Sequence, residues 1–158
     1  TMRDLAWWTG WGTRAAATAA RDAGVLEVRL EATDEPGLVL VDDVEDDAHP
    51  VVEERVSLLP GLDPTPMGWK RRDFYLGPHA DALFDRNGNV VPTIWLGGRV
   101  VGGWAQRTDG GIAFRLLEDV GKDASHRVAA EAATLEAWLD GTVAVPRFRT
   151  PLERELAA

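Results

Sequence analysis

The sequence predicts an α+β fold in which two helices and a β-hairpin precede a β-rich, barrel-like domain with a packed helix. Three observations predict this class. The first 24 residues are rich in Ala and carry apolar side chains at helical spacing. The second half holds apolar segments separated by glycine pairs, which is typical of strands and tight turns. Between them, residues 25–58 carry eleven acidic and two basic side chains, which accounts for the formal net charge of −9.

The N-terminal segment predicts two helices joined by a short turn. Thr1 and Asp4 have the spacing of a capping box, so a first helix is expected to begin there. Gly10 is placed to end this helix, because glycine adopts left-handed backbone conformations without strain. Thr13 is expected to cap a second, Ala-rich helix, and Gly24 is expected to end it.

A β-hairpin is expected directly after these helices. Residues 25–31 form the outgoing strand, alternating from Glu27 onward, and residues 38–41 supply the return strand. Together the segments predict a winged helix-turn-helix unit, a motif whose second helix enters the major groove of DNA. The unit is expected to be partial, because a winged helix has three helices and only two precede this hairpin.

Three polar side chains of the second helix, Arg14, Thr18 and Arg21, can reach phosphates or base edges and are predicted to bind DNA. We expect the winged helix-turn-helix unit over residues 1–43, with its first helix missing. An acidic linker is expected over 44–50, because a run of like charges is typical of a solvated connection. The β-rich domain is expected over 51–158.

Glycine turns order the strands of the β-rich domain. A first strand is expected within 51–59. Gly97-Gly98 predicts a hairpin between strands at 91–96 and 99–106, and a third strand at 112–117 completes a meander.

A helix with apolar residues on one face should follow the meander. Asp123 or Ser125 is expected to cap this helix, and Gly141 is expected to close it. A short strand over 142–145 and a helical tail complete the predicted order.

The seven Trp side chains divide by their position in these elements. Trp95, Trp104 and Trp138 lie in elements that should bury one face, so they are expected in the core. Three others crowd the first short helix and its turn, at positions 7, 8 and 11, and cannot all be internal to a two-helix unit. Some of these are expected to pack at an interface with another domain.

A basic triplet in the β-rich half is a second candidate for DNA contact. The segment consists of Lys70, Arg71 and Arg72, with Trp69 before it and Phe74-Tyr75 after it. Basic residues interleaved with aromatic ones suit a surface that binds phosphate and stacks on bases. The alternative interpretation is a solvated loop whose aromatic side chains pack inward.

The remaining polar residues predict no catalytic site, metal site or cofactor. The chain has no Cys, and its three histidines, at positions 49, 79 and 126, lack ligand spacing. Carboxylates at positions 63, 73, 81 and 85 could form an acid–base pair, but each stands where Asp commonly forms a turn or cap. No apolar run approaches the roughly 20 residues that span a membrane, so a cytoplasmic protein is expected.

Several short motifs in the β-rich half carry a family resemblance. In chain order they are Leu-Leu-Pro, Asp-Pro, Asp-Arg-Asn-Gly, Pro-Thr and Gly-Arg-Val-Val-Gly-x-Trp, within 58–64, 83–88, 92–96 and 98–104. With the helix-turn-helix, this pattern resembles the C-terminal part of the bacterial winged-helix DNA-binding family that includes the YcaQ-like and AlkZ-like DNA glycosylases.

The resemblance implies several winged-helix domains packed around a C-terminal β-barrel, in proteins that excise alkylated bases or unhook crosslinks. It further implies catalysis by a Gln followed two residues later by Gln or Asp, in an N-terminal region. The chain has one Gln, Gln106, which is followed two residues later by Thr108. No catalytic residue is therefore transferred, although the parent protein could still be a glycosylase.

Three functions stay open on this basis. The chain is expected to be a C-terminal fragment of a glycosylase-like protein that acts as a scaffold and lines part of a DNA channel. Its partners would be double-stranded DNA, bound weakly, and the missing N-terminal winged-helix domains. A non-enzymatic DNA-binding or regulatory module is an alternative. A protein-interaction domain is another, which the acidic net charge favours.

Overall fold

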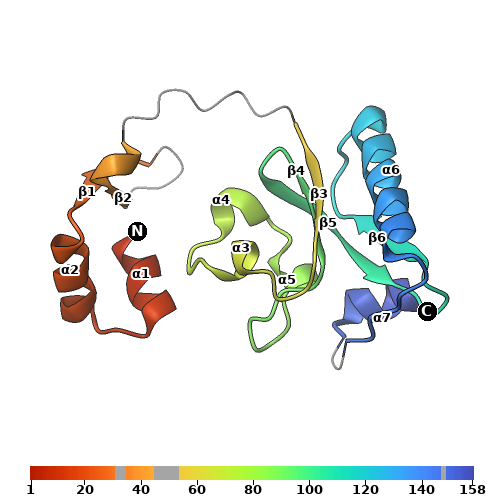
Figure 1. Cartoon of the computed structure of the whole chain (residues 1–158), viewed down its shortest axis with the longest axis horizontal. Helices are drawn as coiled ribbons and strands as arrows, with labels where there is room; N and C mark the ends of the chain where they lie inside the picture. The colour runs from red at the N-terminus through yellow and green to blue at the C-terminus, as the bar shows by residue number, and fades with distance from the viewer. Residues whose placement is uncertain (31–34, 45–53, 147–148) are drawn as a thin grey trace. The chain divides into compact units, whose positions relative to one another are not determined.

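The computed structural model describes residues 1–30, 35–44, 54–146 and 149–158 (Figure 1). The chain divides into two compact units. Unit 1 comprises Thr1–Val51 and Gly68–Arg71, and unit 2 comprises Val52–Met67 and Arg72–Ala158. Most of the predicted acidic linker lies outside the described residues, and the predicted domain boundaries stay predictions.

Unit 1 begins with two helices joined by a short turn. Its elements are α1 (Met2–Thr9), α2 (Thr13–Asp22), β1 (Val25–Val28), β2 (Gly37–Leu40) and the short 3-10 helix η1 (Val41–Asp43). The predicted capping box is confirmed, because the Asp4 N–H donates to Thr1 Oγ1 at 3.2 Å and the Asp4 carboxylate accepts from the Thr1 backbone. The predicted turn is also confirmed, since Gly10 ends α1 at a φ of 69°.

The prediction that Thr13 caps α2 is wrong. The N-cap is Gly12, whose extended backbone suits that position but which offers no side chain, and Thr13 is the first helical residue. The helix buries Ala16 and Ala20 on one face. It ends at Asp22, and Gly24 follows with a positive φ of 70°, one residue after the cap.

The predicted hairpin of unit 1 is confirmed, with a shorter first strand than expected and a return strand of the expected length that begins one residue earlier. Strands β1 and β2 pair antiparallel, with Val25 opposite Leu40 and Val28 opposite Gly37. Residues 31–34, which include the end of the predicted outgoing strand and part of its connection to the return strand, lie outside the described residues.

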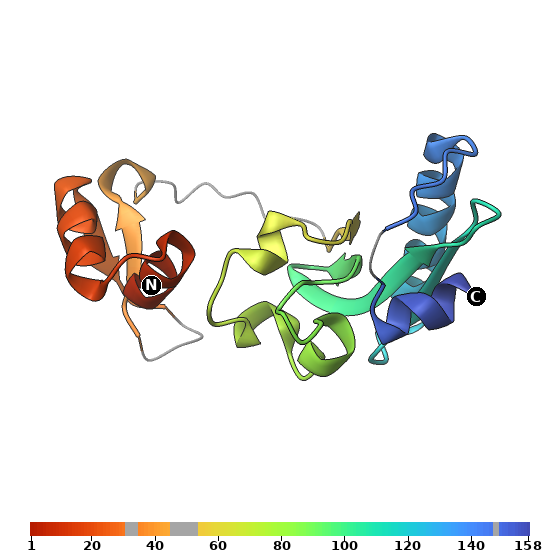
Figure 2. The same cartoon turned by 90° about the horizontal axis from the view of Figure 1, so that it is seen from below.

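Unit 2 is built on a four-stranded antiparallel sheet with the order β3-β4-β5-β6 (Figures 1 and 2). Its strands are β3 (Val56–Leu59), β4 (Thr93–Leu96), β5 (Arg99–Gln106) and β6 (Ile112–Leu116). The predicted meander is confirmed in β4, β5 and β6, with Gly97 and Gly98 at the first turn.

The described strands form an open sheet, which corrects the expectation of a barrel-like domain. Strands β3 and β6 stand at the two edges and do not pair with each other. Helices cover both faces instead, so the sheet buries its apolar side chains without closing on itself. Adjacent residues of β5 show this: Val101 packs with Val128 of the long helix, and Val100 packs with Leu152 of the last helix.

The helices of unit 2 are α3 (Pro64–Met67), α4 (Asp73–Leu76), α5 (Ala80–Leu83), α6 (Lys122–Leu139) and α7 (Pro151–Ala157). The prediction that Asp123 or Ser125 caps α6 is wrong. The N-cap is Gly121, and the helix already begins at Lys122. The predicted tail helix is confirmed as α7. It begins with a second capping box, formed by Thr150 and Glu153. Among the described helices, none combines the length and the apolar character that crossing a membrane requires.

The strand predicted over 142–145 is wrong, and the side chain of Gln106 explains why. Its amide nitrogen donates to the Thr142 carbonyl at 2.8 Å, and its amide oxygen accepts from the Ala144 N–H at 2.9 Å. Two of the backbone groups that a strand would pair with a neighbouring strand are therefore satisfied by one buried side chain.

The Trp side chains of the core follow the prediction in two cases out of three. Trp104 packs against the cluster on the α6 side of the sheet, and Trp95 packs against the cluster on the other side. Trp138 is 77% exposed, so its predicted burial is wrong. It lies near the end of α6, off the stripe formed by the buried Val128 and Ala132.

We expect Trp138→Gln to change the free energy of unfolding by less than about 0.5 kcal/mol, because the side chain has little contact to lose. Val128→Ala on the same helix should cost about 2 kcal/mol, since Val128 is fully buried. Urea denaturation followed by circular dichroism measures both. A cost for Trp138→Gln as large as that for Val128→Ala would contradict the exposed placement.

Candidate nucleic-acid interface

The second helix of unit 1 carries the first predicted contact set on one face. Arg14, Thr18 and Arg21 follow at spacings of four and three residues, opposite the buried Ala16 and Ala20. All three side chains are exposed. Within the described residues they make no side-chain hydrogen bond or ion pair, so they form a polar stripe available to a ligand.

A surface depression lies beside this stripe. It is lined by Trp11, Gly12, Arg14, Ala15, Thr18, Ala19 and Asp22. Arg14 and Thr18 line it, whereas Arg21 does not. Asp22 adds a negative charge to the lining of the depression, which would weaken the attraction for phosphate.

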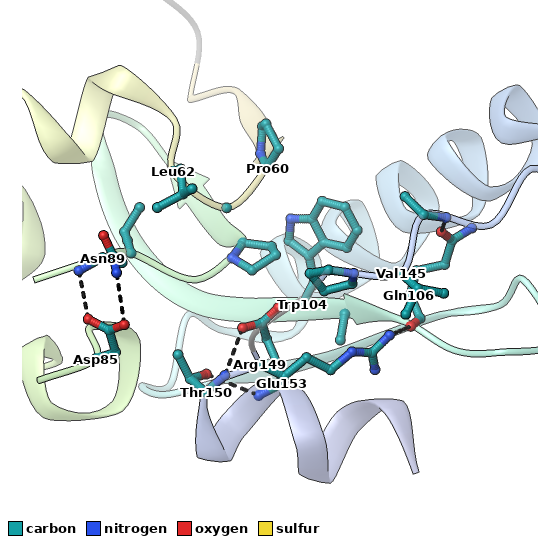
Figure 3. A pocket seen from close by; sticks show the side chains of 16 residues that line it. Pro60, Leu62, Asp85, Asn89, Trp104, Gln106, Val145, Arg149, Thr150 and Glu153 are labelled. Carbon is teal, nitrogen blue, oxygen red and sulfur yellow. Dashed lines mark hydrogen bonds between the residues drawn. The ribbon is translucent and has the colours of Figure 1, made fainter. Parts of the chain in front are cut away.

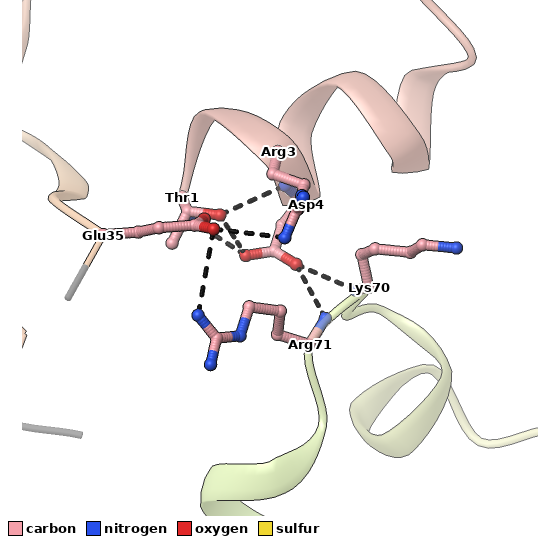
Figure 4. Close-up of polar contacts among 6 residues, drawn as sticks. All are labelled: Thr1, Arg3, Asp4, Glu35, Lys70 and Arg71. Atoms are coloured by element: carbon pink, nitrogen blue, oxygen red, sulfur yellow. Dashed lines mark hydrogen bonds and ion pairs between the residues drawn. The ribbon is translucent and has the colours of Figure 1, made fainter. Parts of the chain in front are cut away.

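The basic triplet is divided between the two units. Lys70 and Arg71 belong to unit 1, and Arg72 belongs to unit 2. The backbone N–H groups of Lys70 and Arg71 donate to Asp4 Oδ1 at 2.8 and 3.2 Å (Figure 4). The Lys70 ammonium lies 6.0 Å from the centroid of the Trp7 ring, within the range of a cation–π contact.

A carboxylate of the hairpin approaches two arginines of unit 1. Glu35 Oε1 lies 3.1 Å from Arg3 Nη1 and 3.8 Å from Arg71 Nη1 (Figure 4). Arg71 therefore has an acidic partner inside its own unit, which lowers its net attraction for a phosphate.

The third member of the triplet and the aromatic residues near it pack inside unit 2. The Arg72 guanidinium lies 4.3 Å from the centroid of the Phe84 ring. Tyr75 is buried, stacks on Trp95 at 5.2 Å and donates its hydroxyl to the Pro66 carbonyl at 2.8 Å. Tyr75 therefore packs inward, as the alternative interpretation of this segment expected, whereas Phe74 is exposed.

The Asp4 carboxylate is the polar centre of unit 1. Burial raises the pKa of this group, but hydrogen bonds from the Thr1 hydroxyl, the Thr1 amino group and the backbone N–H groups of Arg71 and Lys70 together lower the pKa below its ordinary value of 3.8. Asp4 therefore stays ionised and ties α1 to the segment 68–71 of the same unit.

Two of the four carboxylates considered for acid–base chemistry form turns. Asp85 accepts from the Asn89 N–H and side-chain amide, both at 2.9 Å, and from the Asn87 N–H at 2.8 Å. The hydrogen bonds from Asn89, followed by those from Asn87 and Gly88, hold the pKa of Asp85 below its ordinary value. Asp63 accepts from the Thr65 N–H at 2.8 Å. Both are bound as turn acceptors rather than poised for proton transfer.

One histidine of unit 2 belongs to a charged cluster. His79 Nε2 lies 3.0 Å from Glu118 Oε2, and Arg99 Nη2 lies 3.0 Å from Glu118 Oε1. The hydrogen bond from His79, with a further contribution from Arg99, lowers the pKa of Glu118. Over the part of the chain that the structure describes, no group of three or more His, Cys, Asp or Glu side chains is arranged to hold a metal ion.

A cavity of about 520 Å³ in unit 2 contains polar residues that sequence reasoning missed (Figure 3). Arg149 and Glu153 at the start of α7 line it, together with Trp104 of β5. The capping-box spacing of Thr150 and Glu153 is visible in the sequence and predicts a helix start. It does not reveal that the carboxylate faces a cavity, because that depends on strands distant in the sequence.

Comparison with known proteins gives one family and one solved structure. A family model described as "DNA glycosylase AlkZ-like" matches residues 1–138. The fold is similar to that of Streptomyces sahachiroi DNA glycosylase AlkZ, with a TM-score of 0.69 and 22% sequence identity. The similarity covers 87% of this chain and 39% of that chain, so this chain spans well under half of the length of the solved protein. No curated protein matches the chain.

Proposed function

Because the chain belongs to the AlkZ-like DNA glycosylase family, as its motifs predicted, we propose that it is part of a DNA-repair protein that binds duplex DNA. In this proposal unit 1 is a winged helix-turn-helix in which α2 is the recognition helix and the β1–β2 hairpin is the wing. Unit 2 acts as a scaffold and lines part of a DNA channel, in a protein of the cytoplasm.

The proposal leaves base excision to other parts of the same protein. The catalytic Gln pair that the family resemblance implies has no counterpart here, since Gln106 is fully engaged with the segment at 142–144. The further winged-helix domains expected on the N-terminal side would supply that chemistry. Excision of alkylated bases or unhooking of crosslinks is thus proposed for the whole protein and not for this chain alone.

The polar stripe of α2 is the observation that carries the proposal. Arg14, Thr18 and Arg21 are exposed, share one face and lie on the helix that follows the turn. Phosphate contacts by two arginines supply a modest, salt-dependent affinity. The acidic net charge of −9 opposes long-range attraction, so we expect weak binding.

Fluorescence anisotropy with labelled duplex DNA tests this proposal. The double variant Arg14→Ala/Arg21→Ala should weaken binding roughly tenfold, or about 1.4 kcal/mol. It should also reduce the slope of log K against log salt by about 2, because each lost phosphate contact removes roughly 0.9 from the slope.

Lys122→Ala is a control for the effect of net charge, since it removes an exposed positive charge from unit 2. Its affinity and salt slope should stay close to those of the unchanged chain. Equal losses for the control and the double variant would point to net charge rather than to α2. Tight binding that persists at high salt would also contradict the proposal.

A second candidate function is a DNA-binding or protein-interaction module without enzymatic activity. The acidic net charge and the position of Asp22 beside the α2 stripe favour it. The two functions separate in an assay of base release from alkylated duplex DNA with the full-length protein. Release supports the repair function, whereas DNA binding without release supports the module.

A further inference from the structure

The cavity of unit 2 has the size of a small-molecule site. It lies between β5, the start of α7 and the turns near Pro60 and Asn89 (Figure 3). Its volume of about 520 Å³ falls in the range usual for pockets that hold small ligands. Most of the lining is apolar, and a few polar groups face the interior, which is the arrangement that orients a ligand.

Glu153 presents an unused acceptor to this cavity. The residue is 6% exposed, and its Oε2 accepts from the Thr150 N–H at 3.0 Å, which fixes the carboxylate in place. Within the described residues, its Oε1 accepts no hydrogen bond. A carboxylate that is fixed in place and whose second oxygen has no protein partner can accept a hydrogen bond from a ligand that brings a donor.

Arg149 presents unused donors to the same cavity. Its Nη2 donates to the Gln106 carbonyl at 3.1 Å, and its own carbonyl accepts from Arg154 Nη1 at 3.0 Å, so the residue is held at both ends. Its Nε and Nη1 have no acceptor among the described residues. Arg149 and Glu153 line one cavity and form no ion pair with each other, so each can pair with a ligand.

The Gln106 side chain lines the cavity but is saturated. Its amide nitrogen donates to the Gly110 and Thr142 carbonyls at 3.3 and 2.8 Å, and its oxygen accepts from the Ala144 N–H at 2.9 Å. Recognition of a ligand therefore falls to Arg149 and Glu153.

Trp104 supplies a flat apolar wall. Its indole N–H donates to the Leu59 carbonyl at 3.0 Å, so the ring has a fixed position beside the cavity (Figure 3). Pro92, Leu62 and Val145 add further apolar lining. Walls of this kind favour a planar ring that stacks on the indole.

From these features we propose that the cavity binds a guanine-type purine nucleoside. The guanine ring carries two adjacent donors, N1–H and the N2 amino group, on one edge, and two acceptors, O6 and N7, beside them. A carboxylate takes the donor pair, and a guanidinium donates to O6 and N7. Adenine has an acceptor at N1 and an amino group where guanine has O6, so it offers neither the donor pair to Glu153 nor the acceptor pair to Arg149.

Isothermal titration calorimetry with guanosine, inosine and adenosine tests the proposal on the full chain. Guanosine should bind with the highest affinity. Inosine, which lacks the N2 amino group, should bind about tenfold more weakly, and adenosine should show no binding at the same concentrations. Equal affinity for guanosine and adenosine, or no binding of guanosine to the folded chain, would overturn the proposal.

The variant Glu153→Gln isolates the carboxylate. Gln is accepted at this position of a capping box, so α7 should still form. The amide NH2 group of the new Gln would face the N1–H and N2 donors of guanine, and two donors cannot form a hydrogen bond with each other. The affinity for guanosine should therefore fall at least tenfold. Arg149→Met, which removes the guanidinium without touching the capping box, should lower the affinity by a similar factor.

Glu155→Gln is the matched control, because Glu155 is an exposed residue of α7 that pairs with Arg115 and does not line the cavity. Guanosine affinity should be unchanged in this variant. Circular dichroism confirms that each variant is folded. If Glu153→Gln and Arg149→Met, both folded, bind guanosine as tightly as the control, the assignment of these two residues is wrong. DNA binding through α2 is measured separately, so either proposal can fail without the other.

Discussion

Replacing Gly102 by Ala is expected to destabilise unit 2 by roughly 3–5 kcal/mol. Gly102 stands in β5 opposite Ile94 on one side and Leu116 on the other. A Cβ atom at this position would lie 2.3 Å from the Arg115 carbonyl oxygen and 3.2 Å from Leu116 Cα. Both atoms belong to the backbone of β6, so no rotation of a side chain relieves the clash, and β5 and β6 must separate.

Urea denaturation followed by circular dichroism measures this effect, and two other glycines of unit 2 calibrate it. Gly61→Ala meets atoms no closer than 3.5 Å and should cost less than about 1 kcal/mol. Gly103→Ala meets the Leu152 side chain at 2.9 Å, which can move, so an intermediate cost is expected. A cost for Gly102→Ala no larger than that for Gly61→Ala would show that β5 and β6 are not paired as described.

Replacing Asp4 by Ala is expected to destabilise unit 1 by about 2–4 kcal/mol. Asp4 is buried, and its carboxylate accepts from the Lys70 and Arg71 N–H groups, which would lose their partner. The capping box of α1 would be lost with it. Hydrogen exchange of the α1 and α2 amides measures the effect on unit 1 separately from unit 2.

Asp4 should also make the stability of unit 1 depend on pH in a defined direction. The pKa of Asp4 in the folded protein lies below the ordinary value of 3.8. Its contribution to the stability of unit 1 is therefore complete above pH 3.8 and is lost as the pH falls through the folded pKa. Asp4→Asn, which cannot ionise, should lack this loss. Asp22→Asn is a control of equal charge change, because Asp22 is exposed. An Asp4→Asn variant with the same acid sensitivity as the control would rule out this role for Asp4.

The two sets of predicted DNA-binding residues differ in what the fold does with them. Arg14, Thr18 and Arg21 lie together on one exposed helix face, as helical spacing alone requires. Lys70, Arg71 and Arg72 are adjacent in sequence but belong to different units. Sequence adjacency therefore did not predict a shared surface, and DNA contact stays a prediction for both sets.

The sequence by itself determined the features that depend on neighbours a few residues away. The capping boxes at Thr1 and Thr150, the turn at Gly10 and the hairpin at Gly97 follow from local hydrogen bonds and allowed backbone angles. The order of strands in the meander follows from the same short turns. The family motifs, which lie mostly in these turns and strands, were also readable from the sequence.

Only the tertiary structure decided the features that depend on distant partners. Residues 142–145 fail to form a strand because Gln106, far away in sequence, binds their backbone. Trp138 is exposed because α6 meets the sheet through Val128 and Ala132, and helices on both faces leave the sheet open. The cavity with Arg149 and Glu153 exists because α7 packs beside β5. Side-chain burial is set by what packs against an element, and no local pattern contains that information.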